Sequence, residues 1–577
     1  MARHRLGLSS ASRWRWPAAV AVVATGLSML LLGNGLLHQD TWRGNAGDPE
    51  QAIWWLAYVP HAIMHGHNPL YTDFALYPNG ANLMWNTAVI LPALVMAPVT
   101  LTLGPVTTYN LLLVAAPATT AWAAQLALRR YVDHQASAAV GALLFAFTPS
   151  IVAHATGGHL QIALAALLPL LLLVGDEALI RQRWPVARCG VTLGLLAVAQ
   201  LLTGEELLFI EALLGVIAVA ILLGLNWRRR TEIRARVPYA LRAFGLAGAV
   251  FVPLAAYPLV VQVFGRRHAP SPHAKNVYVA DLANFVRPVD MLLRFGAHGS
   301  ALPFTGNSSE WTSYLGIPLV ITLVAVTMWC WRRSGAVRLA AIGAVVLAVC
   351  SLGESLHVNG HDTGIPMPWR VVTHIPVVSQ LLPARLSIGV ALCAAVLVAV
   401  FVDRVIAVQR PMMMAGASAL VGAVVATAIP WGLPTTSIAT PAFFRSAAVR
   451  HNVGQDEVVL VSPYIFGPAS EQPMLWQAEA GMRYRMVDGW LIVPGQHWGE
   501  PTPAATILYD VEVRGDPVPA DSADLNALTG YLHATHVTRV LVAPSYRQAA
   551  VMELFTLAFR HGPGAEAGGV AVWKVPA

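Results

Sequence analysis

The chain has 577 residues, of which 56% are hydrophobic and only 12% are charged, and its mean hydropathy is +0.57. Soluble globular proteins rarely reach this composition, and long apolar runs recur, so the sequence predicts a polytopic membrane protein. The net charge of +7 would suit nucleic acid, but the arginines cluster in short loops between apolar runs, which is the pattern of membrane topology. The four cysteines have no C-x-x-C spacing, so neither a disulfide framework nor a zinc site is expected.

The membrane portion is predicted to contain about eleven spanning helices, each able to cross a hydrocarbon core of about 30 Å, the shortest only barely. The first run follows several arginines, as in a signal peptide. It is long for a signal peptide and lacks a small-residue cleavage site, so a retained helix is expected. The runs lie near residues 17–37, 107–128, 136–152, 160–175, 187–203, 207–226, 240–262, 314–331, 337–353, 386–406 and 412–431.

The segment 88–104 is apolar, but prolines interrupt it and remove helical hydrogen-bond donors. If this segment is interfacial or re-entrant and the N-terminus is cytoplasmic, the arginine clusters all lie inside, as the positive-inside rule requires. If the segment 88–104 crossed the membrane, every arginine cluster would lie on the exoplasmic side. The near absence of lysine, with only Lys275 and Lys574, is typical of a high-GC bacterial genome. The sequence therefore predicts a bacterial inner-membrane protein with a cytoplasmic N-terminus and an exoplasmic C-terminal region.

The predicted transmembrane domain covers residues 1–431 and has three large exoplasmic loops. These loops hold many of the histidines, carboxylates and aromatic residues outside the apolar runs, and loops of such length are usually functional or disordered. They lie at residues 38–106, 263–313 and 354–385.

The composition changes at about residue 432. The runs Glu457–Val461 and Thr538–Ala543 have the pattern of short buried strands, and Ser522–Ala534 and Tyr546–Arg560 have helical patterning. The segment 432–577 is therefore predicted to be a small exoplasmic α/β domain. It has no Gly-rich phosphate loop.

Two carboxylates follow the first run in the stretch Gly47-Asp48-Pro49-Glu50-Gln51. Helix-start chemistry explains part of this stretch, since Asp48 is a good N-cap and Glu50 complements the helix dipole. A carboxylate held at a membrane surface can also act as general base toward an acceptor hydroxyl. The two interpretations are compatible, because a cap also fixes the position of its residue. Asp48 and Glu50 are therefore the candidate catalytic residues.

Three histidines follow in the helix that this stretch is expected to begin. His61 and His65 are four residues apart, which is a metal-ligand spacing. No glutamate follows His61 as in a zinc protease, and interfacial histidines are more often polar contacts. No metal is therefore assigned to His61, His65 and His67.

Two exoplasmic turns carry further candidates. His154 and His159 flank two glycines and could donate to phosphate or sugar oxygens, although a solvated hairpin turn would look the same. Glu205 and Glu206 begin a span, where they could serve as helix-start charges. Glu211 lies within that span, and a carboxylate at such depth faces a cavity or a partner.

Two long loops supply the last candidates. Glu310 stands beside Trp311 just before a span, and a carboxylate beside aromatic rings is common both in sugar sites and in interfacial belts. Arg385 also precedes a span, on the predicted exoplasmic side. A guanidinium there suits a lipid phosphate, and an ion pair with a loop carboxylate is the alternative.

Taken in order, these features resemble the GT-C superfamily of membrane glycosyltransferases, which use polyprenyl-phosphate-linked sugars. The resemblance rests on the acidic stretch Gly47–Glu50 after the first helix, the proline-interrupted segment Leu91–Gly104, and the span ends Leu128–Tyr131 and Phe145–Pro149. It covers residues 17–210 well and the later spans by general shape.

The resemblance implies an all-α polytopic membrane bundle with a GT-C-like fold, carrying a small C-terminal exoplasmic α/β domain. It implies that Asp48 acts as catalytic base or orients the acceptor, and Arg385 is the nearest match to the family's phosphate-binding arginine. Where the family often has a second acidic residue, this chain has His154 and His159, so a metal role there is in doubt. No metal ligand is assigned, and a divalent metal stays open as a cofactor.

The expected function is transfer of a hexose or pentose from a polyprenyl-phosphate donor at the exoplasmic membrane face, with Asp48 as general base. The acceptor would be a cell-envelope glycan, a lipid or a protein. The alternatives are a transporter or flippase of a lipid-linked substrate, and a non-catalytic envelope-assembly protein. A transporter predicts inverted repeats and many deep polar residues, of which only Glu211 is evident. The candidate substrate-binding residues are His154, His159, Glu205, Glu206, Glu310 and Arg385.

Overall fold

The computed structural model describes residues 10–576, except residues 39, 87, 270–271, 290–291, 293–303, 375–377, 431–432, 438, 468–469, 496, 500 and 520–521. Internal contacts divide the chain into two units. Unit 1 comprises Met1–Asn34, Leu111–Ala255 and Ala274–Pro434, and unit 2 comprises Gly35–Asn110, Ala256–His273 and Thr435–Ala577.

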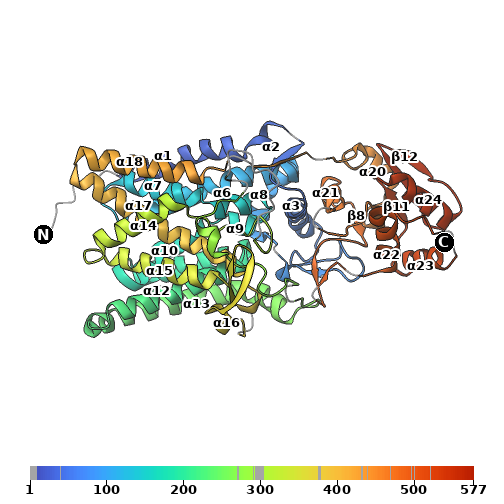
Figure 1. Cartoon of the computed structure of the whole chain (residues 1–577). Helices are drawn as coiled ribbons and strands as arrows, with labels where there is room; N and C mark the ends of the chain where they lie inside the picture. The colour runs from blue at the N-terminus through green and yellow to red at the C-terminus, as the bar shows by residue number, and fades with distance from the viewer. Residues whose placement is uncertain are drawn as a thin grey trace. The chain divides into compact units, whose positions relative to one another are not determined.

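Unit 1 is a helical bundle, as the sequence predicts (Figure 1). A short hairpin of β4 (Ser355–Val358) and β5 (His361–Pro366) lies in one of its long loops. Two of its helices, α6 and α13, continue into unit 2. The helices are α1 (Ser10–Leu32), α6 (Pro105–Leu128), α7 (Gln135–Ala146), α8 (Pro149–Thr156), α9 (Leu160–Ala163), α10 (Leu167–Asp176), η2 (Glu177–Arg181), α11 (Val186–Thr203), α12 (Glu205–Leu225), α13 (Arg230–Phe264), η3 (Leu282–Phe285), α14 (Ile317–Cys330), α15 (Gly335–Ser351), α16 (Trp369–Val372), η5 (Val378–Gln380), η6 (Pro383–Leu386), α17 (Ser387–Val408) and α18 (Pro411–Ala428).

The described residues form eight helices that are long and apolar enough to cross a membrane. A ninth candidate span is the pair α7 and α8, which is bent by 40° at the break between the two helices. The two remaining predicted spans form the shorter apolar helices α14 and α15, of 14 and 17 residues. The chain is therefore a multi-pass membrane protein, as its composition indicates.

α17 is the central helix of unit 1. It packs against α7, α14, α15 and α18, and most of its residues are buried. Small residues bring two other helices, α11 and α13, close together. A Cβ on Gly190 would lie 2.7 Å from the carbonyl oxygen of Ala243, and a Cβ on Gly194 would lie 2.7 Å from that of Ala247. Close approach at small residues is a usual basis of helix packing in membranes.

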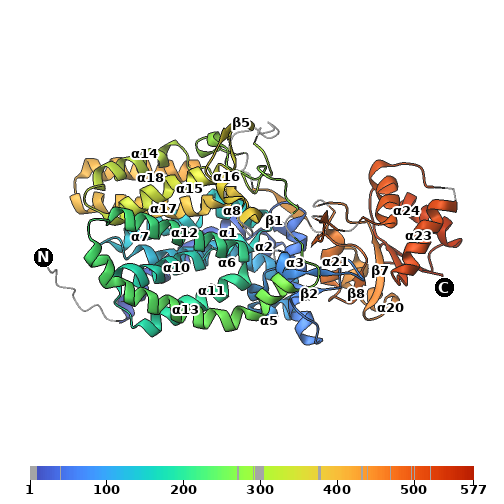
Figure 2. The ribbon, with the colours of Figure 1, turned by 90° about the horizontal axis from the view of Figure 1, so that it is seen from below.

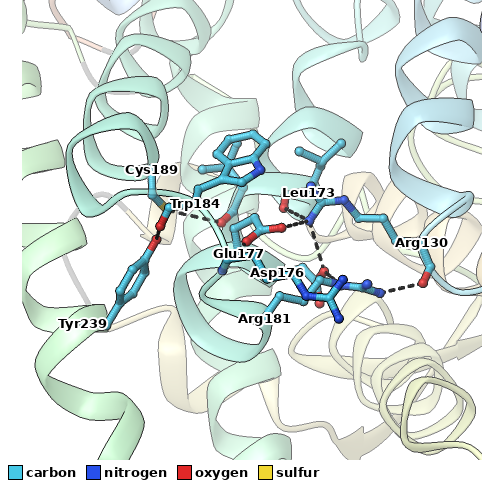
Figure 3. A network of polar contacts seen from close by, with 10 residues as sticks. Arg130, Leu173, Asp176, Glu177, Arg181, Trp184, Cys189 and Tyr239 are labelled. Carbon is cyan, nitrogen blue, oxygen red and sulfur yellow. Dashed lines mark hydrogen bonds and ion pairs between the residues drawn. The ribbon is translucent and has the colours of Figure 1, made fainter. Parts of the chain in front are cut away.

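A network of ion pairs joins helix ends in unit 1 (Figure 3). Nη1 of Arg130, just after α6, donates to Oε1 of Glu177 at 2.9 Å and to Oδ2 of Asp176 at 3.3 Å. Arg181 donates from Nε to the same Asp176 oxygen at 2.5 Å. Both carboxylates are buried, so the two guanidinium groups offset the cost of taking these charges out of water. The network fixes the end of α6 against η2.

Unit 2 contains the predicted α/β domain together with the first large loop. Its five-stranded sheet has the order β12-β13-β11-β7-β8, in which β7 runs parallel to β11 and β8, and β13 runs antiparallel to β11 and β12. The two runs predicted as strands form β7 and β11, and the two predicted helices form α23 and α24. The strands are β1 (Thr41–Arg43), β2 (Tyr71–Thr72), β3 (Ala81–Asn82), β6 (Thr435–Ser437), β7 (Glu457–Ser462), β8 (Tyr484–Met486), β9 (Ile492–Val493), β10 (His497–Trp498), β11 (Arg539–Val542), β12 (Ala565–Ala567) and β13 (Val570–Lys574).

The first large loop folds into α3, which packs against α21 (Figure 2). The proline-interrupted segment that follows forms no spanning helix. It forms α4 and α5, helices of 6 and 7 residues, because its prolines break the helix. The helices of unit 2 are α2 (Asn34–Leu37), α3 (Asp48–Met64), η1 (Leu83–Trp85), α4 (Ile90–Val95), α5 (Ala97–Leu103), α19 (Ala442–Arg445), α20 (Ala447–Asn452), α21 (Gln472–Glu479), α22 (Pro503–Tyr509), η7 (Asp510–Arg514), α23 (Ser522–Ala534) and α24 (Gln548–Phe559).

Candidate functional site

The candidate site of unit 1 begins at the turn between α8 and α9. A Cβ on Gly157 would lie 2.5 Å from the hydroxyl oxygen of Ser309, so glycine lets the turn lie close to the loop before α14. Gly158 has a φ of 84°, which side chains with a Cβ rarely adopt. The turn brings two imidazoles together, with Nδ1 of His154 lying 2.9 Å from Nδ1 of His159.

Glu310, in the loop before α14, joins these histidines. Its side chain is buried, and one nitrogen of each of His154 and His159 and one oxygen of Glu310 all lie within 4.8 Å of one another. Its Oε1 accepts hydrogen bonds from Nε of Arg385 at 2.9 Å and from Nη2 at 2.6 Å. This is a fork-shaped, charge-assisted contact of the kind that arginine forms best.

Arg385 links Glu310 to the start of another helix. η6 holds the arginine in a buried position, and its Nη1 donates to Oε2 of Glu206 in the first turn of α12. The other oxygen of Glu206 accepts from the backbone N–H of Leu382 at 3.4 Å. The ion pair considered as an alternative for Arg385 is therefore present, and it involves two carboxylates.

This ion pair decides the charge of Glu310. Burial raises the pKa of the Glu310 carboxyl, but the charge of Arg385, helped by the neighbouring imidazoles, holds that pKa at about 2, below its ordinary 4.5. Glu310 is therefore an anion at neutral pH. Because its pKa is depressed in the folded protein, its contribution to stability is present above pH 4.5 and is lost as the pH falls toward 2.

Several polar atoms around this cluster are buried and have no hydrogen-bond partner among the described residues. They are Nε2 of His154, Oε2 of Glu310, Oε1 of Glu205 and Nε2 of Gln161. Buried polar groups are normally satisfied, so this concentration of unused donors and acceptors makes the cluster the candidate ligand site of unit 1. Two imidazole nitrogens and a carboxylate oxygen are also a donor set that suits zinc or manganese.

Asp48 belongs to unit 2, where the expected N-cap is wrong by one residue. The cap of α3 is Gly47, with a φ of 106°, and Asp48 is the first residue of the helix. The backbone N–H of Gly47 donates to Oε2 of Glu50 at 2.7 Å, so Glu50 closes the first turn. Asp48 is half-buried and Glu50 is buried, which makes Asp48 the more accessible carboxylate of the pair.

Glu50 gives unit 2 a predicted pH dependence. Burial raises its pKa from 4.5 to about 8, although the hydrogen bond from Gly47 opposes the shift. An acid with a raised pKa stabilises the fold below its ordinary pKa and loses that contribution as the pH rises through the folded value. The free energy of unfolding of the wild type should therefore fall between pH 4.5 and 8 more steeply than that of Glu50→Gln. Equal slopes in thermal unfolding would contradict this assignment.

The structure brings the predicted substrate-binding residues together. His154, His159, Glu206, Glu310 and Arg385 are linked by the contacts described, and Glu205 adjoins Glu206. The catalytic candidates Asp48 and Glu50 lie in the other unit. Sequence reasoning missed Glu471 of unit 2, whose pKa is raised by burial and by the charges of Asp48 and Glu50. No local pattern could have found it, because it is distant in sequence from both.

The histidines at the end of α3 and just after it, His61, His65 and His67, pack against one another rather than around a common point. The rings of His61 and His65 stack with centroids 4.1 Å apart, and Nδ1 of His65 lies 2.9 Å from the carbonyl oxygen of His61. Burial lowers the pKa of His61 to about 4, and the neighbouring His65 adds to the shift. His61 is therefore neutral at physiological pH, as expected for a packed polar contact.

A family of sequences shares most of this chain. The model of a domain of unknown function, DUF6311, matches residues 14–378. The chain belongs to the DUF6311 family. No curated protein matches this DUF6311 member in sequence.

Solved structures resemble this DUF6311 protein in fold. The arabinofuranosyltransferase AftD from Mycobacteria matches with a TM-score of 0.54 at 14% identity, over 98% of this chain and 40% of that one. The oligosaccharyltransferase of Archaeoglobus fulgidus in its apo form matches with a TM-score of 0.50 at 14% identity, over 92% of this chain and 70% of that one. ArnT from Cupriavidus metallidurans matches with a TM-score of 0.45 at 14% identity, over 98% of both chains. The fold is that of GT-C glycosyltransferases, as the sequence resemblance implies.

Proposed function

We propose that this DUF6311 protein transfers a sugar from a polyprenyl-phosphate donor to a cell-envelope acceptor at the exoplasmic face of a bacterial inner membrane. The observation that carries the proposal is the buried cluster of unit 1, where His154, His159, Glu310, Arg385 and Glu206 meet from separate segments of a GT-C fold. A packed structural core does not need these polar groups, and several of their atoms are unused.

In the proposed reaction, Asp48 accepts the proton of the acceptor hydroxyl as its oxygen attacks the anomeric carbon of the donor. The bond between that carbon and the phosphate oxygen breaks, and polyprenyl phosphate leaves with the electron pair. Attack opposite the leaving group inverts the anomeric centre. Asp48 suits this role because it is the accessible carboxylate of its pair, while Glu50 supports the helix turn that holds it.

Arg385 has a different role from a simple phosphate ligand. Its guanidinium is already bound by Glu206 and Glu310, so little of its charge is left for an anion. We assign it to holding the two carboxylates in place within unit 1, beside the turn that carries His154 and His159.

The histidine turn also fits a divalent cation. His154, His159 and Glu310 would hold it, since their ligand atoms lie within 4.8 Å of one another and Oε2 of Glu310 is unused. One guanidinium facing two carboxylates leaves a surplus of negative charge that a cation offsets. When bound, such a cation would stabilise the negative charge of the leaving phosphate.

A metal-content measurement checks this site. Protein purified without chelator should carry close to one equivalent of zinc or manganese per chain by mass spectrometry. His159→Ala should lower this content at least tenfold, because removing one ligand of a small set weakens metal binding strongly. His61→Ala is the matched control, since His61 stacks on another histidine outside the cluster. Equal metal content in wild type and His159→Ala would rule out the assignment.

The function itself is tested by turnover. The purified protein, in nanodiscs, would be offered radiolabelled polyprenyl-phosphate hexoses and pentoses together with a cell-envelope extract as acceptor source. The expected result is consumption of one donor and transfer of its label to an acceptor. Movement of intact donor across the bilayer of sealed vesicles, without cleavage, would instead support the flippase alternative and overturn the proposal.

A further inference from the structure

Within unit 2, the helices α3 and α21 pack against each other (Figure 2). Nε1 of Trp54 in α3 donates to Oε1 of Gln477 in α21 at 2.5 Å. Asp48 and Glu471 each stand six residues before this contact, and the backbone N–H of Gln51, in the first turn of α3, hydrogen-bonds to the Glu471 carboxyl, so the two helix starts lie close together. The electrostatic effect of Asp48 on Glu471 agrees with this placement, since the charge of Asp48 raises the pKa of Glu471.

Glu471 is an unusual residue for a protein interior. Its side chain is 0% exposed, and no side chain among the described residues hydrogen-bonds to either of its carboxyl oxygens, which face only the backbone N–H of Gln51. Its charged neighbours, Asp48 and Glu50, are both acidic. A buried carboxyl without a positively charged partner destabilises a fold, so its presence is better explained by a ligand than by packing.

An aromatic pair lies at the same two helix starts. The Gln51 side chain donates to the carbonyl oxygen of Trp490, and the backbone N–H of Trp490 points to the sulfur of Met474 at 3.4 Å. The rings of Trp490 and Trp498 stack with centroids 5.2 Å apart and planes 10° from parallel. Both side chains are part-exposed, so this pair offers apolar ring surface to solvent.

The aromatic pair is held rigidly. Trp498 is the last residue of the hairpin formed by β9 and β10, and in this hairpin it pairs with Ile492. Asn86 anchors this hairpin from both sides: the backbone N–H of Ile492 donates to Oδ1 of Asn86 at 2.7 Å, and Nδ2 of Asn86 donates to the Ile492 carbonyl at 3.1 Å. A fixed, part-exposed aromatic surface binds with little loss of side-chain entropy.

We propose that the acceptor is a glycan, whose sugar ring packs on the Trp490–Trp498 pair and whose hydroxyl reaches Asp48, with Glu471 as the carboxyl that positions it. The inference rests on the proposed function, because Asp48 is there the base toward the acceptor. A sugar ring has an apolar C–H face and a rim of hydroxyls, so it needs aromatic surface and carboxyl groups together. A peptide or a simple lipid hydroxyl would not need the aromatic pair.

A binding experiment tests the acceptor class without requiring turnover. The full chain in nanodiscs would be titrated with disaccharides of arabinofuranose, galactofuranose, mannose and glucose, and with a serine-rich peptide as competing class. Glucoside and maltoside detergents must be avoided, because they present sugars themselves. Calorimetry and tryptophan fluorescence should detect binding of at least one disaccharide and none of the peptide. Binding of the peptide alone, or of nothing, would overturn the inference.

Two variants locate the site. Trp498→Leu should weaken disaccharide binding at least tenfold, whereas Trp227→Leu, which replaces an exposed tryptophan of unit 1, should not change it. Equal disaccharide binding by Trp498→Leu and Trp227→Leu would overturn the role of the aromatic pair. Glu471→Leu should raise the melting temperature, because it removes a buried carboxyl that has no positively charged partner, and should weaken disaccharide binding. A merely structural Glu471 would show a lower melting temperature with unchanged binding.

The inference and the proposed function fail separately. If the protein turns over a polyprenyl-phosphate sugar but binds no disaccharide, the proposed function stands and the glycan assignment falls. If it binds a disaccharide through Trp498 but cleaves no donor, the glycan site stands and the transferase proposal falls.

Discussion

Asp48→Asn is expected to lower sugar transfer by about 10²- to 10⁴-fold, because a positioned general base contributes a factor of that size. Asparagine keeps the shape of the side chain but cannot accept the proton. The variant should fold, since the N-cap of α3 is Gly47 and the substitution removes a helix-start charge worth about 0.3–1 kcal/mol. Initial rates with a saturating polyprenyl-phosphate sugar, measured beside thermal unfolding, separate these two effects.

Asp510→Asn is the matched control for this experiment. Asp510 is also a carboxylate of unit 2, but it pairs with Arg514 at 3.0 Å on the surface. Its replacement should leave both transfer and unfolding near wild type. Full transfer by a folded Asp48→Asn would remove Asp48 from the mechanism. A loss of folding in Asp48→Asn would show instead that the helix start, and not the base, is what this residue provides.

Arg385→Met should destabilise unit 1 by about 3–5 kcal/mol, the usual cost of removing one partner from a buried ion pair. Methionine leaves Glu310 fully buried and Glu206 partly buried, with no guanidinium to offset either charge. Thermal unfolding can be followed with a thiol-reactive dye, because Cys189 and Cys330 are free and buried in the folded chain. The variant should melt well below wild type and yield less folded protein.

Two further variants test whether uncompensated buried charge causes the loss of stability in Arg385→Met. Arg229→Met breaks an exposed ion pair with Glu232 and should change the melting temperature little, because exposed pairs contribute little. The triple replacement Arg385→Met, Glu206→Gln and Glu310→Gln removes the buried charges along with their partner. It should melt above Arg385→Met alone. If the triple variant is the less stable of the two, uncompensated charge is not the cause of the loss.

The sequence by itself determined which segments form helices long and apolar enough to cross a membrane, and which apolar segment does not. Apolar runs of spanning length fixed the main helices, and prolines fixed the break that became α4 and α5, because both effects act within a few residues. Short continuous apolar runs identified β7 and β11 for the same reason. The cap of α3 was wrong by one residue, since Gly47 adopts a positive φ that the residue pattern does not reveal.

The site depended on contacts that no local pattern encodes. The chemistry of His154, Glu310 and Arg385 could be read from their residue types, but their pairing could not. Arg385 meets Glu310 across 75 residues and Glu206 across 179 residues, so an arginine expected to bind phosphate is instead held by two carboxylates. No pattern in the sequence indicated Glu471, because only the packing of α21 on α3 brings it near Asp48. Hydrophobic patterning therefore determined the helices and strands, and tertiary packing alone decided which charges face one another.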